Sequence, residues 1–314
     1  MLFYAIQRIG LSILILITSM VMLFTALKLI PGDPATIMLG SRANAEMKAR
    51  ITEQLGLNDP VIVQLGTFFG RLLQGNLGTD LWSQRPVSQI VIESLPYTLM
   101  LIAAGLGWAM LIGIPLGCYS AVRRNSFVDR LTGIISVATI SIPSFVVAIY
   151  AILLFSIQLG WLPVLGAGDK GDWKDQATHL LMPAFALGLG WVGYLSRIVR
   201  ASMLEVMGEN HVRTARAFGL TEFQIIKSYA LRIAILPTIT LLAVAVGGLL
   251  SSAVFVEAIF ARPGIGKLIV DAASMRNFPV VQGGVLTTVF LFALTMPIAD
   301  LLVAWLDPRV RATL

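Results

Sequence analysis

The chain has 314 residues, of which 57% are hydrophobic and 13% are charged, and its mean hydropathy is +0.84. These values exclude an ordinary soluble domain and predict an integral membrane protein. The net charge of +6 would suggest nucleic-acid binding in a soluble chain, but here membrane topology explains it first, and no nucleic-acid partner is expected. The single cysteine, Cys118, excludes an internal disulfide, and two distant histidines argue against a histidine-built metal site.

Six apolar stretches are predicted to cross the membrane as helices, each long enough for about 30 Å of hydrocarbon. The first follows Arg8 and lacks an A-x-A cleavage site, so we interpret it as a membrane helix and not as a signal peptide. Prolines inside the later stretches should bend their helices by freeing backbone carbonyls. The predicted spans are 9–27, 97–121, 131–157, 179–196, 237–257 and 280–304.

The distribution of lysine and arginine predicts the orientation of these spans. With the N-terminus inside, the short inner segments carry twelve basic residues and the short outer loops carry five, so both termini are expected in the cytoplasm. The inner ones are Arg8, Arg123, Arg124, Arg130, Arg197, Arg200, Arg213, Arg216, Lys227, Arg232, Arg309 and Arg311. The outer ones are Lys170, Lys174, Arg262, Lys267 and Arg276.

The outer segment 31–95 is too long to be a simple connection. Asp59-Pro60 is predicted to open an amphipathic helix that Gly75 ends. A weaker helical pattern precedes Gly56, and a third helical piece is expected between Pro86 and Pro96. These helices could lie on the bilayer, pack over the bundle or meet an external partner, and the sequence leaves the three alternatives open.

The longest polar interruption in the second half of the chain, 197–237, has the pattern of two short helices joined at a glycine. Asn210 is predicted to cap a helix over 211–218, and Gly219 occupies the position where a left-handed C′ residue is favoured. Thr221 and Gln224 then form a capping box that opens a second helix, which Pro237 interrupts.

The surface of the first short helix favours docking on another protein. Arg213 and Arg216 share one face, while Thr214, Ala215 and Ala217 are small enough for close approach by a partner. The alternative is a basic amphipathic helix that rests on anionic membrane lipid. Lipid binding requires neither two capped helices nor the alanines, so docking is favoured.

Motifs for covalent chemistry are missing from the sequence. There is no G-x-x-x-x-G-K-[ST] loop, because Gly264-Ile265-Gly266-Lys267 has the wrong spacing, and there is no HExxH or GxSxG. The middles of the spans carry no ionisable residue, whereas proton-coupled carriers usually need them. We therefore expect no covalent chemistry on this chain, and if it transports a solute actively, the energy must come from another subunit. A stand-alone channel or secondary carrier is the rival class, and a membrane enzyme is more distant.

The run 212–220 (VRTARAFGL), followed by Ala230-Leu231-Arg232 and Leu236-Pro237, resembles the "EAA" loop of ABC importer permeases. Thr214 stands where glutamate is common, and the distance from Gly219 to Pro237 is long, as in the peptide/nickel branch. Further stretches in the same order resemble the B-type permease of dipeptide and oligopeptide importers. They include Pro31-Gly32-Asp33-Pro34, His179-Leu180-Leu181-Met182-Pro183-Ala184, Pro263-Gly264-Ile265-Gly266 and Asp307-Pro308-Arg309.

The resemblance implies an all-α integral membrane protein with the type I ABC importer (MetI-like) permease fold in a bacterial inner membrane. It implies a first part at 1–95, a five-helix core at 96–306 with the coupling loop at 201–236, and a cytoplasmic tail at 307–314. Implied partners are a second, homologous permease subunit, two ATPase subunits that bind ATP and Mg²⁺, and an extracytoplasmic binding protein that selects a peptide, nickel, opine or other solute. No cofactor is expected on this chain. The residues expected to couple to the ATPase are Glu209, Asn210, Val212, Arg213, Thr214, Ala215, Arg216, Ala217, Phe218, Gly219 and Leu220.

Overall fold

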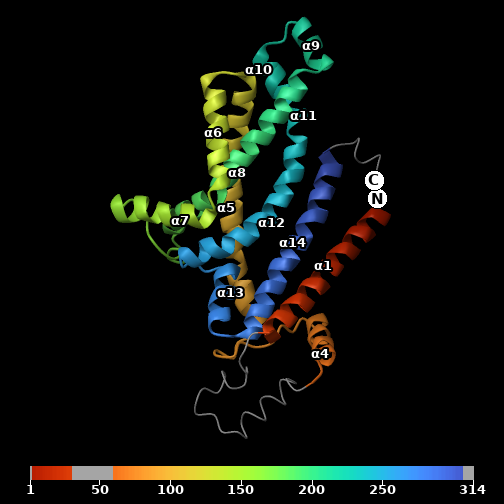
Figure 1. Ribbon diagram of the computed structural model, residues 1–314, viewed down its shortest axis with the longest axis vertical. Coiled ribbons are helices and arrows are strands. Elements are labelled where there is room, and N and C mark those ends of the chain that lie inside the picture. The colour runs from red at the N-terminus through yellow and green to blue at the C-terminus, as the bar shows by residue number, and fades with distance from the viewer. Residues whose placement is uncertain (1, 30–58, 307–314) are drawn as a thin grey trace.

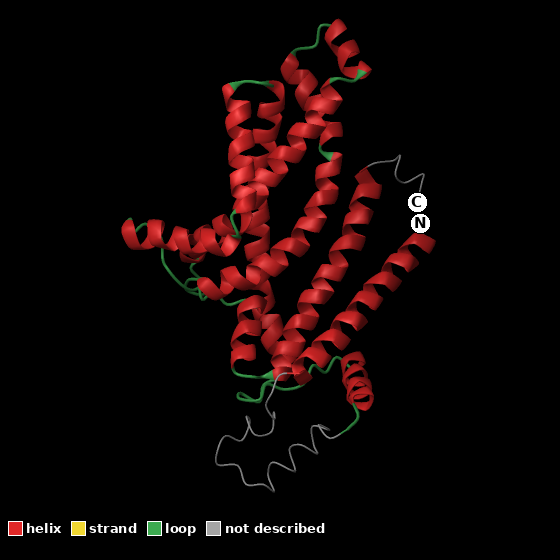
Figure 2. Cartoon of the chain, viewed as in Figure 1, coloured by secondary structure: helices red, strands yellow, loops and turns green. Residues whose placement is uncertain are grey.

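Helices account for almost all of the described chain in the computed structural model, which covers residues 2–29 and 59–306 (Figures 1 and 2). The helix expected before Gly56 and the tail at 307–314 lie outside these residues. The elements are α1 (Leu2–Leu29), α4 (Val61–Leu73), α5 (Val87–Val122), α6 (Phe127–Ser141), α7 (Ser144–Ala151), the π-helix η1 (Ile152–Gln158), α8 (Trp173–Met207), α9 (Asn210–Ala217), α10 (Glu222–Gln224), the π-helix η2 (Ile225–Ala230), α11 (Leu231–Ala234), α12 (Leu236–Ile259), α13 (Ile265–Ser274) and α14 (Phe278–Leu306).

Five helices, α1, α5, α8, α12 and α14, are long and apolar enough to cross a membrane. The sixth predicted span, 131–157, is not one straight helix: α6 and the continuous α7–η1 segment meet at an angle of 98°. Pro143 is the N-cap of α7 and has an extended backbone, as does Ile142 before it. Because proline disfavours the α conformation in the residue before it, the helix breaks here and does not merely bend. The described residues therefore contain five candidate spans, or six when the bent pair is counted as one.

One predicted boundary, near Pro96, differs from the structure. The helical piece expected after Pro86 and the span expected from 97 form one helix of 36 residues, α5, which runs through Pro96 and Pro115. The predicted boundary between 95 and 96 therefore falls inside a helix. Neighbouring helices in a membrane bundle compensate the backbone groups that a proline frees, so the helix continues. The opening predicted at Asp59-Pro60 is confirmed by α4, and Gly75 has a φ of +74°.

Helices α5 and α8 form the central pair of the bundle, and glycines let their backbones approach. An added Cβ on Gly117 would lie 2.5 Å from the Ser196 carbonyl oxygen, and one on Gly188 would lie 2.2 Å from the Gly105 carbonyl oxygen. Buried residues of α5, α7, α8 and α12, among them Leu101, together form the main apolar core. Small residues at a helix interface allow this close approach of the two backbones in a membrane bundle.

A partly buried ion pair connects α6 with α8 near α9, and a residue of α5 also contacts it. Arg200 on α8 donates two hydrogen bonds to Asp129 on α6, with Nε–Oδ1 2.5 Å and Nη2–Oδ2 2.8 Å. Ser120 on α5 donates to the same carboxylate. Asp129 and Arg200 both lie outside the predicted spans 131–157 and 179–196. The pair is therefore consistent with the absence of ionisable residues from the middles of the spans.

At the opposite end of the bundle, a second buried carboxylate holds α13 against α5. Glu257, at the end of α12, accepts hydrogen bonds from Thr98 Oγ1 at 2.6 Å and from the backbone N–H groups of Gly266 and Lys267 at 2.8 and 3.2 Å. The N–H of Ile265 donates to Thr98 Oγ1 at 2.8 Å. The carboxylate thus satisfies N–H groups that the first turn of α13 leaves unpaired.

Candidate coupling site at α9

The helix α9 begins and ends with local hydrogen bonds that the sequence largely predicts. Gly219 has a φ of +80°, and the N–H groups of Gly219 and Leu220 donate to the carbonyls of Arg216 and Ala215. This is a Schellman ending, so the predicted left-handed glycine is confirmed. The predicted Asn210 cap is wrong: Glu209 is the N-cap, and its side chain makes no capping hydrogen bond. The helix gains its stability from packing and its ending, not from its first residue.

The second short helix opens with the predicted capping box. Thr221 Oγ1 accepts from the N–H of Gln224 at 3.4 Å, and the Thr221 N–H donates to Gln224 Oε1 at 3.0 Å. Arg216 bridges the two helices through an ion pair with Glu222 at 2.7 Å. The hydrogen bond from Arg216 holds the pKa of the Glu222 carboxyl below its usual value. The interruption predicted at Pro237 falls at Ile235 instead, between the end of α11 and the start of α12. Pro237 itself stands in the first turn of α12.

The inward face of α9 packs on the chain's own helices. Val212 and Ala215 are buried, with 0% and 4% of their surface exposed, in a cluster with residues of α8, η2 and α11. The expectation that Ala215 presents a small surface to a partner is therefore wrong. An eight-residue helix has two turns, so residues three apart share one face, and that face is occupied here.

The outward face of α9 is what a partner would meet. Arg213, Thr214 and Ala217 are exposed, and Phe218 has 83% of its surface exposed at the helix end. Phe223 on α10 is also exposed. Aromatic rings left in water beside arginines are typical of protein interfaces and not of solvated loops. Among the remaining predicted coupling residues, Glu209, Asn210, Arg216 and Gly219 are exposed and Leu220 is half-buried.

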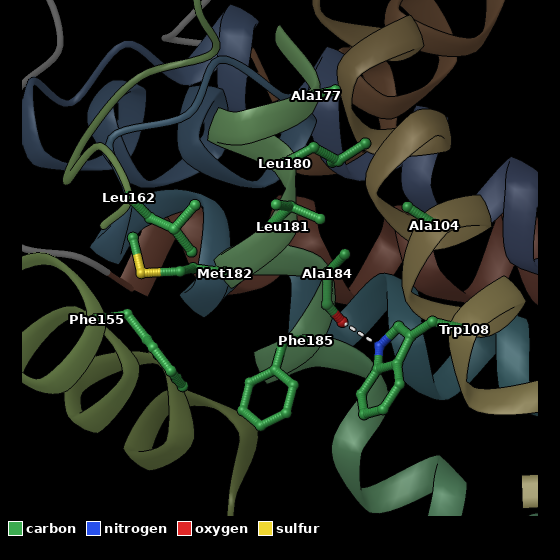
Figure 3. Close-up of a pocket in the computed structure, with 10 residues that line it drawn as sticks. All are labelled: Ala104, Trp108, Phe155, Leu162, Ala177, Leu180, Leu181, Met182, Ala184 and Phe185. Atoms are coloured by element: carbon green, nitrogen blue, oxygen red, sulfur yellow. Dashed lines mark hydrogen bonds between the residues drawn. The ribbon is translucent and has the colours of Figure 1, made fainter. Parts of the chain in front are cut away.

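An apolar pocket of about 490 Å³ lies among α5, η1 and α8 (Figure 3). Phe185 stacks on Trp108 with ring centroids 5.3 Å apart, and the Trp108 indole N–H donates to the Ala184 carbonyl at 2.7 Å. The side chains that line it carry no charge, so this pocket suits hydrocarbon and offers no partner for the charged ends of a peptide. Its residues are Ala104, Trp108, Phe155, Leu162, Ala177, Leu180, Leu181, Met182, Ala184 and Phe185.

The described residues show no group of three or more histidine, cysteine, aspartate or glutamate side chains that could hold a metal ion. The glycine-rich turn at 264–267 places its N–H groups on the carboxylate of Glu257 instead of around an open space. An added Cβ on Gly264 would lie 2.3 Å from that carboxylate. These glycines make room for an internal anion, which agrees with the view that their spacing is wrong for a phosphate loop.

Residues 113–312 match the family described as "Binding-protein-dependent transport system inner membrane component". Residues 1–102 match the corresponding N-terminal family. The chain belongs to this family. It is a multi-pass membrane protein and a permease subunit of an ABC importer, as the EAA-like run predicts.

Curated relatives extend the similarity over the full chain. The chain is 36% identical over 312 residues to the glutathione transport system permease protein GsiC of Salmonella typhimurium, with 99% of each chain covered. It is 38% identical over 308 residues to a putative peptide transport system permease protein of Brucella abortus, with 97% and 98% covered.

Among solved structures, inward-facing conformations of the MetNI methionine ABC transporter are similar in fold. The TM-score is 0.56 at 17% identity, and the match covers 70% of this chain and 97% of that one. At this identity the likeness concerns the fold alone, and it confirms the predicted MetI-like permease fold.

Proposed function

We propose that the chain is one of two homologous permease subunits that together enclose the pathway of an importer for a di- or oligopeptide-type substrate. Two ATPase subunits on the cytoplasmic side bind ATP and Mg²⁺, and this chain itself catalyses no reaction and binds no cofactor. A binding protein delivers the substrate from outside. The relatives named for glutathione and peptide transport support this substrate class, while nickel and opines remain the alternative substrates of the same architecture.

The observation that carries the proposal is the division of α9 into two faces. Val212 and Ala215 fix the helix on the bundle, while Arg213, Thr214, Ala217 and Phe218 are left in contact with solvent. A helix that is fixed on the bundle by buried residues and exposes an aromatic ring can transmit the movement of a bound protein to the spanning helices. The structure of α9 therefore supports its assignment as the helix that couples ATP hydrolysis to transport.

Purification of the chain together with the proposed second permease and the two ATPases tests the function directly. We expect the complex to hydrolyse ATP, and a loaded binding protein to stimulate hydrolysis when its ligand is a short peptide. We also expect the chain alone in liposomes to accumulate nothing against a gradient. Accumulation driven by a proton or sodium gradient would instead favour a secondary carrier, and stimulation by nickel or opine alone would change the substrate class.

The orientation in the bacterial inner membrane has its own test. In a Cys118→Ala background, Arg124→Cys should react with an impermeant maleimide only from the cytoplasmic side, because Arg124 belongs to the basic inner segments. Lys170→Cys should react only from outside, because the connection between η1 and α8 carries few basic residues. Labelling of both from the same side would contradict the six-span topology.

A further inference from the structure

A short polar hairpin, residues 78–87, lies at the end of the bundle opposite α9 (Figure 1). Thr79 and Pro86 form an antiparallel bridge, and the Val87 N–H donates to the Gly78 carbonyl at 3.0 Å. Val87 at its base is fully buried in a cluster with residues of α13 and α14. We call residues 78–87 the outer hairpin.

Asp80 organises the tip of the outer hairpin. Its carboxylate accepts from the backbone N–H groups of Trp82 and Ser83 at 3.3 and 3.0 Å, and from the Ser83 hydroxyl. Partial burial alone would raise the pKa of Asp80, but these hydrogen bonds and one from Asn277 lower it below its usual value. The carboxylate therefore stays ionised and keeps the turn closed at neutral pH.

The same carboxylate ties the hairpin to the transmembrane core. The amide of Asn277, a buried residue in the turn between α13 and α14, donates to Asp80. Gln84 in the hairpin has a φ of +57°, a strained conformation for a residue other than glycine. A strained turn that three hydrogen bonds to Asp80 close, and that a fourth from Asn277 ties to the core, is a pre-organised structure.

This rigid turn displays one large apolar side chain. Trp82 has 57% of its surface exposed, and Thr79, Ser83, Gln84 and Arg85 around it are exposed and polar. Arg85 also forms an ion pair with Glu93 beside it. Charged and polar neighbours would make insertion of this turn into lipid costly, whereas an aromatic ring within a polar rim is the usual arrangement of a protein interface. The chemistry of the tip therefore favours a protein as its partner.

From this arrangement we infer that the outer hairpin is a docking contact for the extracytoplasmic binding protein, with Trp82 as its anchor. The inference rests on the proposed function, which supplies a partner of this kind on this side of the membrane. The basic-residue distribution puts the hairpin outside, and the Asp80–Asn277 link joins it to α13, which Glu257 and Thr98 join to α5 and α12. Docking at Trp82 thus acts on the outer ends of the spanning helices through hydrogen-bonded contacts.

The experiment uses the complete importer in liposomes and the binding protein that stimulates its ATP hydrolysis. For each variant, stimulation is measured relative to hydrolysis without binding protein, over a titration of that protein. Trp82→Ala should raise the concentration for half-maximal stimulation about tenfold or more, as loss of an anchoring aromatic ordinarily does. Trp82→Phe should restore most of the affinity. Asp80→Ala should produce a similar shift, because the turn that positions Trp82 loses its hydrogen bonds.

Trp173→Ala is the matched control, since Trp173 is a tryptophan at the start of α8, on the outer side, and is more exposed than Trp82. It should leave the titration curve unchanged. An unchanged curve for Trp82→Ala, or equal shifts for both tryptophans, would overturn the inference. Loss of the second permease subunit from the Trp82→Ala complex would also overturn it, by placing Trp82 between subunits. If no binding protein stimulates the unsubstituted importer, the proposed function fails, and that result is distinct from an insensitive Trp82.

Discussion

Two short helices, α9 and α13, lie at opposite ends of the same bundle and are held in place by different forces (Figure 1). α13 is fixed by a buried polar network in which Glu257 and Thr98 pair with the N–H groups of its first turn. α9 is fixed by two apolar residues, Val212 and Ala215, and by an exposed ion pair between Arg216 and Glu222. Thus α13, on the outer side of the membrane, is built into the protein interior, whereas α9, on the cytoplasmic side, lies on the protein surface.

The two modes of attachment leave different residues available for binding a partner. Hydrogen bonds to a buried carboxyl group depend strongly on geometry, so α13 has little freedom to change its position relative to α5. Apolar packing by two small side chains fixes α9 while leaving Phe218 in solvent. A residue that contributes little to the fold is free to contribute to a complex. The two ends should therefore respond to substitution in opposite ways, with loss of stability at α13 and loss of partner binding at α9.

The largest effect is expected for Glu257→Ala. This change leaves the Thr98 hydroxyl and the N–H groups of Gly266 and Lys267 without their acceptor in a dry environment. Each buried group that loses its partner costs about 1–3 kcal/mol, so destabilisation of about 3 kcal/mol or more is expected. The thermal midpoint of the purified permease in detergent measures it.

Glu205→Ala provides the control for this prediction, because Glu205 is an exposed glutamate near the end of α8. It should shift the midpoint little. Glu257→Gln should lie between the two, because its amide retains one acceptor oxygen but not the charge. If Glu257→Ala has the same thermal midpoint as Glu205→Ala, the polar network does not stabilise α13. The proposed difference between α13 and α9 would then be wrong.

The second prediction concerns Phe218 at the opposite end. Phe218→Ala should leave the thermal midpoint nearly unchanged, because most of the side chain is already in solvent. It should weaken association with the ATPase about tenfold or more, since aromatic anchors dominate interface energies. Arg213→Ala should weaken association only a few-fold, because exposed charges contribute about 0–1 kcal/mol. Co-purification of the ATPases with each variant, followed by titration, measures both.

A helix that rests on lipid predicts the reverse order of effects. Loss of Arg213 and Arg216 would then matter most, and Phe218→Ala would reduce membrane contact without releasing an ATPase. Retention of the ATPases and normal transport by Phe218→Ala, together with failure of the arginine variants, would remove α9 from the coupling role. Ala215→Trp does not decide between the two roles, because Ala215 is buried and this variant tests the packing of α9 on the bundle and not its partner.

Local chemistry explains why much of α9 could be predicted from the sequence. The left-handed glycine at 219 and the capping box at Thr221 depend on residues within one turn of each other. The burial of Ala215 depends on residues of α8, η2 and α11, which the pattern of an eight-residue helix does not reveal. The spans could be predicted from hydropathy because each has to cross the bilayer by itself.

Contacts between distant residues account for what the sequence did not reveal. Thr98 and Glu257 are 159 positions apart, and nothing in the sequence around either residue indicates that their side chains form a hydrogen bond. The two π-helices, η1 and η2, carry no sequence signal of their own. Pro143 predicted a bend, but not the angle of 98° between α6 and the α7–η1 segment. The outer hairpin was likewise hidden, because its link runs from Asp80 to Asn277.

A smaller effect is expected at Gly219, where backbone conformation alone decides the result. An added Cβ would meet nothing within 4 Å, but the φ of +80° is unfavourable for a side chain branched at Cβ. Gly219→Val should therefore destabilise the turn between α9 and α10 by about 1–2 kcal/mol, and Gly219→Asn by less. Limited proteolysis within 208–221 measures the opening of this turn. Equal cleavage of the two variants would show that crowding, and not conformation, limits this position.

The smallest expected effect sharpens the contrast between a buried and an exposed carboxylate. Glu222 pairs with Arg216 in solvent, and that hydrogen bond lowers the pKa of Glu222 in the folded protein. A lowered folded pKa means that the pair stabilises the fold above the unfolded value of about 4.3 and stops doing so as the pH falls through the folded value. Solvent screening limits the contribution to about 0–1 kcal/mol. Glu222→Gln should therefore lower the thermal midpoint slightly at pH 7, and the difference from the parent should vanish in acid and shrink in 0.5 M salt, a concentration of the order that screens exposed charges. A difference that persists in acid would mean that Glu222 acts through packing, and the two ends of the molecule would then be held by more similar forces than the hydrogen bonds indicate.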